Sequence, residues 1–166
     1  DLMYGGTAFY PVHQNVIWTL LLGLLGIRLM EAARAKGKRW LYVLTCAAVV
    51  VLGFALGTLG MVDYYGAGVL TVFAFYFFRE RKWWCLLGQL AALYWLNVVV
   101  LGGQMYPVTL FGREIELCEQ GLALLALVPI WLYRGRQGHH SKAFQYACYA
   151  FYPAHMLVLA LLTMIQ

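Results

Sequence analysis

A histidine in the middle of the last apolar segment is the residue whose chemistry most needs an explanation. The segment from Ala143 to Gln166 carries Gln145, Cys148, Tyr152 and His155 at helical spacing. At ~1.5 Å per residue, His155 lies about 18 Å along such a helix, and burying a histidine at that depth in a bilayer is costly unless it has a partner or a task. Imidazole titrates near neutral pH and suits proton transfer. We therefore predict that His155 is a general base or a positioning group, with an interhelical hydrogen bond as the alternative.

Most other polar residues near the apolar segments gather towards one side of the predicted bundle. They are His13, Gln14, Asn15, Asp63, Tyr64, Tyr65, Asn97, Glu116, Glu119 and Gln120. We expect them to line a cavity open to the outside, in which Asp63 or Glu119 would orient His155 and make it a better base. The alternative is that each side chain makes a hydrogen bond between helices or contacts lipid headgroups.

Arginines at the other side suggest contacts with an anion. Arg28 lies inside the first apolar segment, with Glu31 one turn further on. An ion pair between residues i and i+3 explains both side chains, and Arg28 could also extend to the inner interface. The functional alternative is a contact with the phosphate of a nucleotide-bearing cofactor that enters from the cytoplasm. Arg34 and Arg79, in two basic loops, could bind the same phosphate, although topology alone explains them.

The elements that must position these residues are predicted to be membrane helices. Hydrophobic residues make up 63% of the 166 residues and charged residues 11%, and the mean hydropathy is +0.71. A soluble domain is nearer half apolar and a quarter charged. We predict an all-α, polytopic membrane bundle in a single domain over residues 1–166. Its six spans lie at about 13–33, 40–61, 64–78, 83–101, 117–133 and 143–166, with a long loop at 102–116.

The charges follow the pattern of a membrane topology. Ten of the twelve basic residues lie in three alternate loops, 34–39, 79–82 and 134–142. The positive-inside rule places these loops in the cytoplasm and both ends of the chain outside. The net charge of +5 is therefore explained by topology, and we expect no nucleic-acid partner.

Small residues indicate how the first two helices pack. Asn15, Thr19, Gly23 and Gly26 share one face of the first segment, and Gly53, Gly57 and Gly60 share one face of the second. Small residues at this spacing allow close helix contacts in lipid. The four cysteines are widely separated and form no CxxC motif, so we expect no metal site.

Three blocks resemble the TraX family of polytopic membrane proteins. They are HQNVIWTLLLGLLGI at 13–27, VDYYGAGVLTVFAFYFFRERK at 62–82 and KAFQYACYAFYPAHMLVLALL at 142–162. The resemblance implies acetyl transfer from acetyl-CoA, which in this family is associated with N-terminal acetylation of conjugative pilin. It implies a bacterial cytoplasmic membrane and places His155, His13 and Asn15 in catalysis, with Tyr152 beside them.

The resemblance also completes the expected set of binding residues. Tyr152, Asp63, Tyr65 and Glu119 are expected to bind substrate, and Arg28, Arg34 and Arg79 to bind the acyl donor. The acceptor is a peptide N-terminus, a sugar or a lipid. Family members usually begin with earlier helices that bear an Asp-His pair, so we expect this chain to be the C-terminal portion of a longer protein.

Two other classes of function remain open from the residues. The polar cluster could be the binding site of a small-molecule transporter or channel component, and FYPVH at 9–13 nearly repeats FYPAH at 151–155. The small-residue faces could instead bind a partner in a non-catalytic membrane scaffold.

Overall fold

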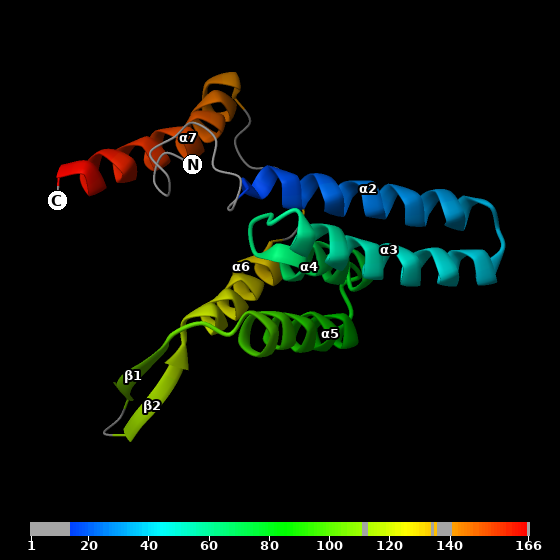
Figure 1. Ribbon diagram of the computed structural model, residues 1–166, viewed down its shortest axis with the longest axis horizontal. Coiled ribbons are helices and arrows are strands. Elements are labelled where there is room, and N and C mark those ends of the chain that lie inside the picture. The colour runs from blue at the N-terminus through cyan, green and yellow to red at the C-terminus, as the bar shows by residue number, and fades with distance from the viewer. Residues whose placement is uncertain (1–13, 111–112, 134, 136–140, 166) are drawn as a thin grey trace. The chain divides into compact units, whose positions relative to one another are not determined.

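The computed structural model in Figure 1 describes residues 14–110, 113–133, 135 and 141–165. The chain forms two units, which we describe separately. The larger unit covers residues 11–131, and the smaller combines residues 1–10 with residues 132–166. Predictions that fall on His13 or on most of the basic loop 134–142 lie outside the described residues.

The larger unit is built on three helices that pack against one another. These are α2 (Val16–Ala35), α3 (Arg39–Leu59) and α4 (Tyr65–Phe77). Helix α2 begins where the Asn15 side chain accepts a hydrogen bond from the Ile17 backbone N–H at 3.0 Å, which satisfies one of the amides that a helix start leaves unpaired.

The small residues of α2 and α3 make close contact with α4 possible. Thr19, Gly23, Gly26, Gly53 and Gly57 are all buried, which confirms the predicted packing faces at these positions. The ring of Phe73, itself 2% exposed, fills the space that the glycines leave. A Cβ atom would lie 2.6 Å from that ring at Gly26 and 2.7 Å from it at Gly53. Gly60 is exposed and instead ends α3 as its C-cap.

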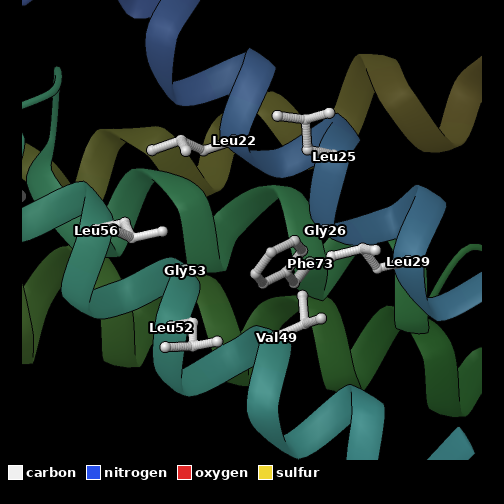
Figure 2. A pocket seen from close by; sticks show the side chains of 9 residues that line it. All are labelled: Leu22, Leu25, Gly26, Leu29, Val49, Leu52, Gly53, Leu56 and Phe73. Atoms are coloured by element: carbon white, nitrogen blue, oxygen red, sulfur yellow. The ribbon is translucent and has the colours of Figure 1, made fainter.

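An apolar groove remains on the surface above this contact. Figure 2 shows leucines of α2 and α3 on either side of Phe73, with Gly26 and Gly53 next to the ring. The groove has a volume of about 220 Å³ and is lined almost wholly by carbon. Its leucines, such as Leu29 and Leu52, are more than half exposed, as expected of side chains that face lipid.

The next part of the unit changes helix type before a hairpin. Helix α5 (Trp83–Tyr94) continues as the π-helix η1 (Trp95–Leu101), which together match the predicted fourth span. Gly102 and Gly103 follow, with φ of +67° and +120°. Glycine adopts such angles without steric cost, so the chain can leave the helix here.

The predicted loop at 102–116 is wrong, because the chain forms an antiparallel hairpin there. Strand β1 (Met105–Leu110) pairs with β2 (Arg113–Cys118) in the register Tyr106 with Leu117, and Val108 with Ile115. Alternating β-branched and aromatic residues favour a strand. Gly and Pro in the same stretch had suggested irregular structure instead.

The predicted fifth span at 117–133 is also corrected. Leu117 and Cys118 belong to β2, and the chain then forms the 3-10 helix η2 (Glu119–Ala126) and the short α6 (Leu127–Leu132). Hydropathy reports apolar character only, so it could not separate a strand end and a 3-10 helix from an α-helix. The protein is mostly helical but not all-α.

Among the residues that the structure describes, three helices are both long and apolar enough to cross a membrane, at Val16–Ala35, Arg39–Leu59 and Trp83–Leu101. Helix α4 has 13 residues, or roughly 20 Å at ~1.5 Å per residue, which is less than the ~30 Å hydrocarbon core. The predicted third span is therefore too short to cross alone. In the smaller unit, α7 (Lys142–Ile165) has 24 residues and contains Pro153, so its length suits a span.

Candidate functional site

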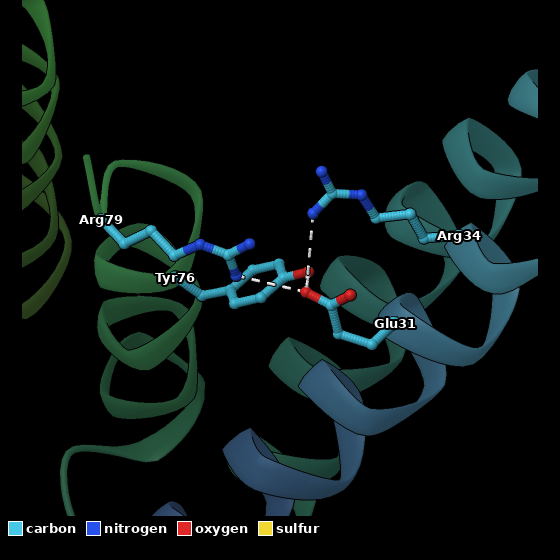
Figure 3. Close-up of polar contacts among 4 residues, drawn as sticks. All are labelled: Glu31, Arg34, Tyr76 and Arg79. Atoms are coloured by element: carbon cyan, nitrogen blue, oxygen red, sulfur yellow. Dashed lines mark hydrogen bonds and ion pairs between the residues drawn. The ribbon is translucent and has the colours of Figure 1, made fainter.

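A carboxylate shared by two arginines and a tyrosine lies at the basic end of the larger unit. The Tyr76 hydroxyl donates to Glu31 Oε1 at 2.6 Å, and Arg79 Nη1 donates to the same oxygen at 3.2 Å. Arg34 Nη1 lies 3.7 Å from it, one turn along α2. Figure 3 shows three side chains converging on Glu31: Arg34 from α2, Tyr76 from α4 and Arg79 from the segment after α4. Glu31 therefore holds the guanidinium groups of Arg34 and Arg79 close to each other.

A cavity of about 220 Å³ opens beside this cluster. We call it the arginine pocket, and its lining residues are Arg34, Tyr42, Tyr76, Phe77, Arg79 and Glu80. The Arg79 guanidinium carbon lies 4.7 Å from the centre of the Tyr76 ring, within the range of a cation–π contact. Ring and carboxylate together orient Arg79, which lines the cavity.

The surroundings of the arginine pocket are strongly basic. Residues 31–39 and 79–82 contain seven basic and two acidic side chains, a net charge of +5. Of the two acids, Glu31 pairs with the arginines and Glu80 forms an ion pair with Lys82. The hydrogen bond from Lys82 lowers the pKa of Glu80, and the same contact raises the pKa of Lys82. Both stay charged at neutral pH, so the net positive charge persists.

The predicted pair between Arg28 and Glu31 is wrong. Among the described residues, Glu31 pairs with Arg34 and Arg79, and Arg28 is exposed and does not line the arginine pocket. The Glu31 carboxylate pairs with Arg79, which follows a different helix, and not with Arg28 on its own helix. Of the three arginines predicted to bind a donor, the structure therefore brings Arg34 and Arg79 together.

A second, larger cavity lies towards the opposite ends of the same helices. Its volume is about 340 Å³, and α2, α4, η1, η2 and neighbouring residues contribute to it. Its polar lining consists of Thr19, Tyr64, Thr71, Asn97 and Gln120. We call it the amide pocket. Asn97 is 7% exposed and lies inside the π-helix, a type of helix that is frequent at functional sites.

The turn beside the amide pocket holds an unusual backbone. Met61, Tyr64 and Tyr65 have φ between +48° and +59°, which side-chain-bearing residues seldom adopt and which costs free energy. Hydrogen bonds hold the turn in place: Gln14 N–H donates to the Met61 carbonyl at 3.0 Å, and Thr19 Oγ1 donates to the Asp63 carbonyl at 2.8 Å.

Three of the four residues predicted to bind substrate lie next to this pocket and not in its lining, and the fourth, Tyr152, belongs to α7 of the smaller unit. Asp63 and Tyr65 flank Tyr64, and Glu119 precedes Gln120. Asn15 caps α2 with its side-chain oxygen, and Tyr65 and Glu119 are exposed. Among the polar residues expected to line a cavity, Tyr64, Asn97 and Gln120 line this one, and Asp63, Tyr65 and Glu119 each lie one position from a lining residue.

His155 lies in α7 of the smaller unit. Its Nδ1 is 3.0 Å from the Phe151 carbonyl oxygen, one turn earlier, and the two rings stack with centroids 5.2 Å apart. If Nδ1 carries the proton and donates to this carbonyl, Nε2 is left as the basic atom. The side chain of Tyr152 lies outside what the structure describes.

Two buried or half-buried groups were not predicted as functional. Tyr42 and Tyr76 complete the arginine pocket, and a tyrosine one turn before Arg79 is the signal that could have revealed Tyr76. Among the described residues, no group of three His, Cys, Asp or Glu side chains gathers as a metal site would require.

Long apolar helices, a basic end and two cavities define a helical integral membrane protein. The family model described as TraX protein matches residues 2–163, nearly the whole chain. The chain belongs to the TraX family. Searches of curated proteins and of solved structures found no match to it.

Proposed function

We propose that this chain is an integral membrane acyltransferase that moves an acetyl or other acyl group from acyl-CoA to an amine or hydroxyl. Membership of the TraX family supports a role associated with conjugation. The observation that carries the proposal is the arginine pocket, in which Arg34 and Arg79 come together although 45 positions separate them.

The chemistry of the arginine pocket fits the phosphates of coenzyme A. Guanidinium groups bind phosphate oxygens through paired N–H donors. Glu31 offsets one of the two arginine charges, so one positive charge remains for an anion, with the tyrosine hydroxyl of Tyr42 as a further donor at the edge. The positive-inside rule puts this end in the cytoplasm, where acyl-CoA is made. Under this proposal, the phosphates bind here.

The acyl transfer itself needs a base and an oxyanion donor. The acceptor nitrogen or oxygen attacks the thioester carbonyl, the carbon–sulfur bond breaks, and CoA leaves as the thiolate. We assign the removal of the acceptor proton to His155 Nε2. We propose Asn15 or a tyrosine hydroxyl as the donor to the oxyanion, and His13 and Tyr152 as further functional residues. The acceptor is a peptide N-terminus, a sugar or a lipid.

The proposal is tested by binding of acetyl-CoA to the purified full chain in lipid nanodiscs. Ligand at 100 times its dissociation constant raises the free energy of unfolding by ~2.7 kcal/mol, which a thermal melt reports. We expect Arg34→Gln and Arg79→Gln each to weaken binding by roughly tenfold or more, the loss of a charge-assisted contact. Arg28→Gln is the matched control, because Arg28 lies on α2 outside the pocket.

Dephospho-CoA and ATP test which parts of acetyl-CoA the protein recognises. Acetyl-CoA should stabilise the protein more than either does, because neither combines the acyl-pantetheine arm with all three CoA phosphates. If Arg28→Gln weakened the binding of acetyl-CoA equally, the phosphates would not bind in the arginine pocket. Absence of any stabilisation by acetyl-CoA would contradict the acyltransferase proposal and favour a transporter or a scaffold.

A further inference from the structure

The amide pocket has a polar end and an apolar end. Tyr64, Asn97 and Gln120 line it near the α3–α4 turn and the hairpin. Phe75 and Ile130, further along α4 and α6, line it without any polar atom in their side chains. From Tyr64 to Phe75 the pocket extends roughly 16 Å along α4, at ~1.5 Å per residue. This is about half the thickness of a bilayer core.

The polar end retains unused hydrogen-bonding capacity. Asn97 Nδ2 donates to the Leu93 carbonyl at 2.9 Å. In the part of the chain that the structure describes, neither the Asn97 carboxamide oxygen, the Gln120 amide nor the Tyr64 hydroxyl forms a hydrogen bond. The described buried side chains include no nitrogen or oxygen without a partner, so the Asn97 oxygen is open to the pocket.

The two threonines of the lining do not add to this capacity. Thr19 donates its hydroxyl to the Asp63 carbonyl, and Thr71 donates to the Ala67 carbonyl at 2.9 Å. Among the described residues, no acidic or basic side chain lines the amide pocket. A buried charge without a partner is costly, so the site selects against charged headgroups. Two amides and a phenol instead match a neutral group that both donates and accepts hydrogen bonds.

We propose that the amide pocket binds a membrane lipid with a single hydrocarbon chain and a neutral, hydrogen-bonding headgroup. The chain lies against Val72, Phe75 and Ile130, and the headgroup contacts Asn97, Gln120 and Tyr64. This site is separate from the arginine pocket, and the inference does not depend on acyl transfer. The lipid reaches the pocket sideways from the bilayer, because two of the candidate membrane spans, Val16–Ala35 and Trp83–Leu101, line it.

The test uses a monoacylglycerol with a photoreactive diazirine in its chain and the full-length chain in phosphatidylcholine nanodiscs. After illumination, mass spectrometry locates the adducts. We expect them on peptides that contain Val72, Phe75 and Ile130, and we expect excess unlabelled monoacylglycerol to remove them. A diazirine fatty acid, charged as the carboxylate, should label these peptides several-fold less.

Two matched variants separate the pocket from the general lipid surface. Ala123 lines the pocket, and Leu125 on the same 3-10 helix is 64% exposed. Ala123→Trp should reduce pocket labelling by roughly fivefold or more because it fills the cavity, while Leu125→Trp should leave it unchanged. Asn97→Leu, which keeps the volume but removes the amide, should reduce monoacylglycerol labelling by roughly fivefold, about one hydrogen bond.

The competition experiment uses the unaltered protein and decides the question even if a variant does not fold. Adducts spread evenly over exposed leucines, or adducts that unlabelled monoacylglycerol does not remove, would overturn the proposal. So would equal labelling by the charged fatty acid. In a folded Ala123→Trp variant, labelling equal to that of the unaltered protein would also exclude the pocket as the binding site.

Discussion

Arg79 Nη1 lies 3.2 Å from Glu31 Oε1, although the two residues are 48 positions apart in the sequence. The contact joins the basic end of α2 to the residue that follows α4, and the Tyr76 hydroxyl bonds to the same carboxylate oxygen. One acidic residue therefore fixes two arginines, one tyrosine and two helix ends. The stability of this end of the protein and, under our proposal, its binding of acyl-CoA both depend on Glu31.

The first prediction concerns Tyr76→Phe, which removes the hydroxyl that donates to Glu31. We expect a loss of about 0.5–1.5 kcal/mol in the free energy of unfolding, typical of one hydrogen bond. Denaturant unfolding in mild detergent would measure it. Tyr94→Phe is the control, because Tyr94 is 54% exposed and bonds to no described side chain. Equal losses in both variants would show that the hydroxyl contact contributes nothing.

The second prediction concerns the close contact between α3 and α4 at Gly53. A Cβ there would lie 2.7 Å from the Phe73 ring, so Gly53→Ala should destabilise the protein by about 1–3 kcal/mol through overpacking. Gly121→Ala should have little effect, since its nearest neighbours would lie at 3.7 Å.

Replacing Phe73 with a smaller side chain offers a check on that mechanism. Adding Phe73→Leu to Gly53→Ala should recover part of the loss, so that the double variant is more stable than the two single effects predict. Simple additivity would mean that the alanine acts through another neighbour.

The helix packing illustrates what the sequence was able to predict. The spacing of Thr19, Gly23 and Gly26 on one helix and of Gly53 and Gly57 on the other marked the buried faces, because small side chains on one face have few other uses in lipid. The ends of α2, α3 and α5–η1 also lie close to the predicted bounds. Such features depend on local periodicity, which sequence reasoning can read.

Features that depend on distant contacts were not predictable in the same way. Arg79 contacts Glu31 because α4 ends after 13 residues, at Phe77, beside the basic end of α2. The hairpin at Met105–Cys118 and the 3-10 helix after it were hidden because apolar content alone does not distinguish backbone types. Of the polar residues expected to line a cavity, Tyr64, Asn97 and Gln120 do line the amide pocket, whereas Asp63, Tyr65 and Glu119 are chain neighbours of its lining residues.

The third prediction concerns a buried polar chain near α5. Trp131 Nε1 donates to Gln89 Oε1 at 2.7 Å, and Gln89 Nε2 donates to the Phe78 carbonyl at 2.9 Å. Gln89 is 5% exposed, so Gln89→Leu leaves two half-buried partners, the Trp131 N–H and the Phe78 carbonyl, without their hydrogen bonds and should cost about 1–3 kcal/mol. Thermal melts of the purified protein would measure the loss.

A double variant tests whether the cost arises from stranded partners. Gln89→Leu combined with Trp131→Phe removes both members of the side-chain pair, so its total loss should be smaller than the sum of the two single losses. A total loss equal to or larger than the sum of the two single losses would indicate that lost packing, and not the polar contact, dominates.

The fourth prediction concerns His155 as the proposed base. His155→Ala should lower the rate of acyl transfer by roughly a hundredfold or more, the usual contribution of general base catalysis, with the binding of acetyl-CoA unchanged. His140→Ala, in the basic loop of the sequence, is the control. A decrease of less than about threefold in His155→Ala would remove this residue from the mechanism.

The measurement that tests the central claim most directly is the release of free CoA thiol from acetyl-CoA by the protein in lipid vesicles. A thiol reagent follows it with time, and isotope-labelled acetyl traces the acceptor. We predict that the arginine pocket controls this release. Arg79→Gln should slow it roughly tenfold or more at subsaturating acetyl-CoA, and Arg28→Gln should leave it unchanged. Release in vesicles with the unaltered protein that is no faster than with Arg79→Gln would contradict it.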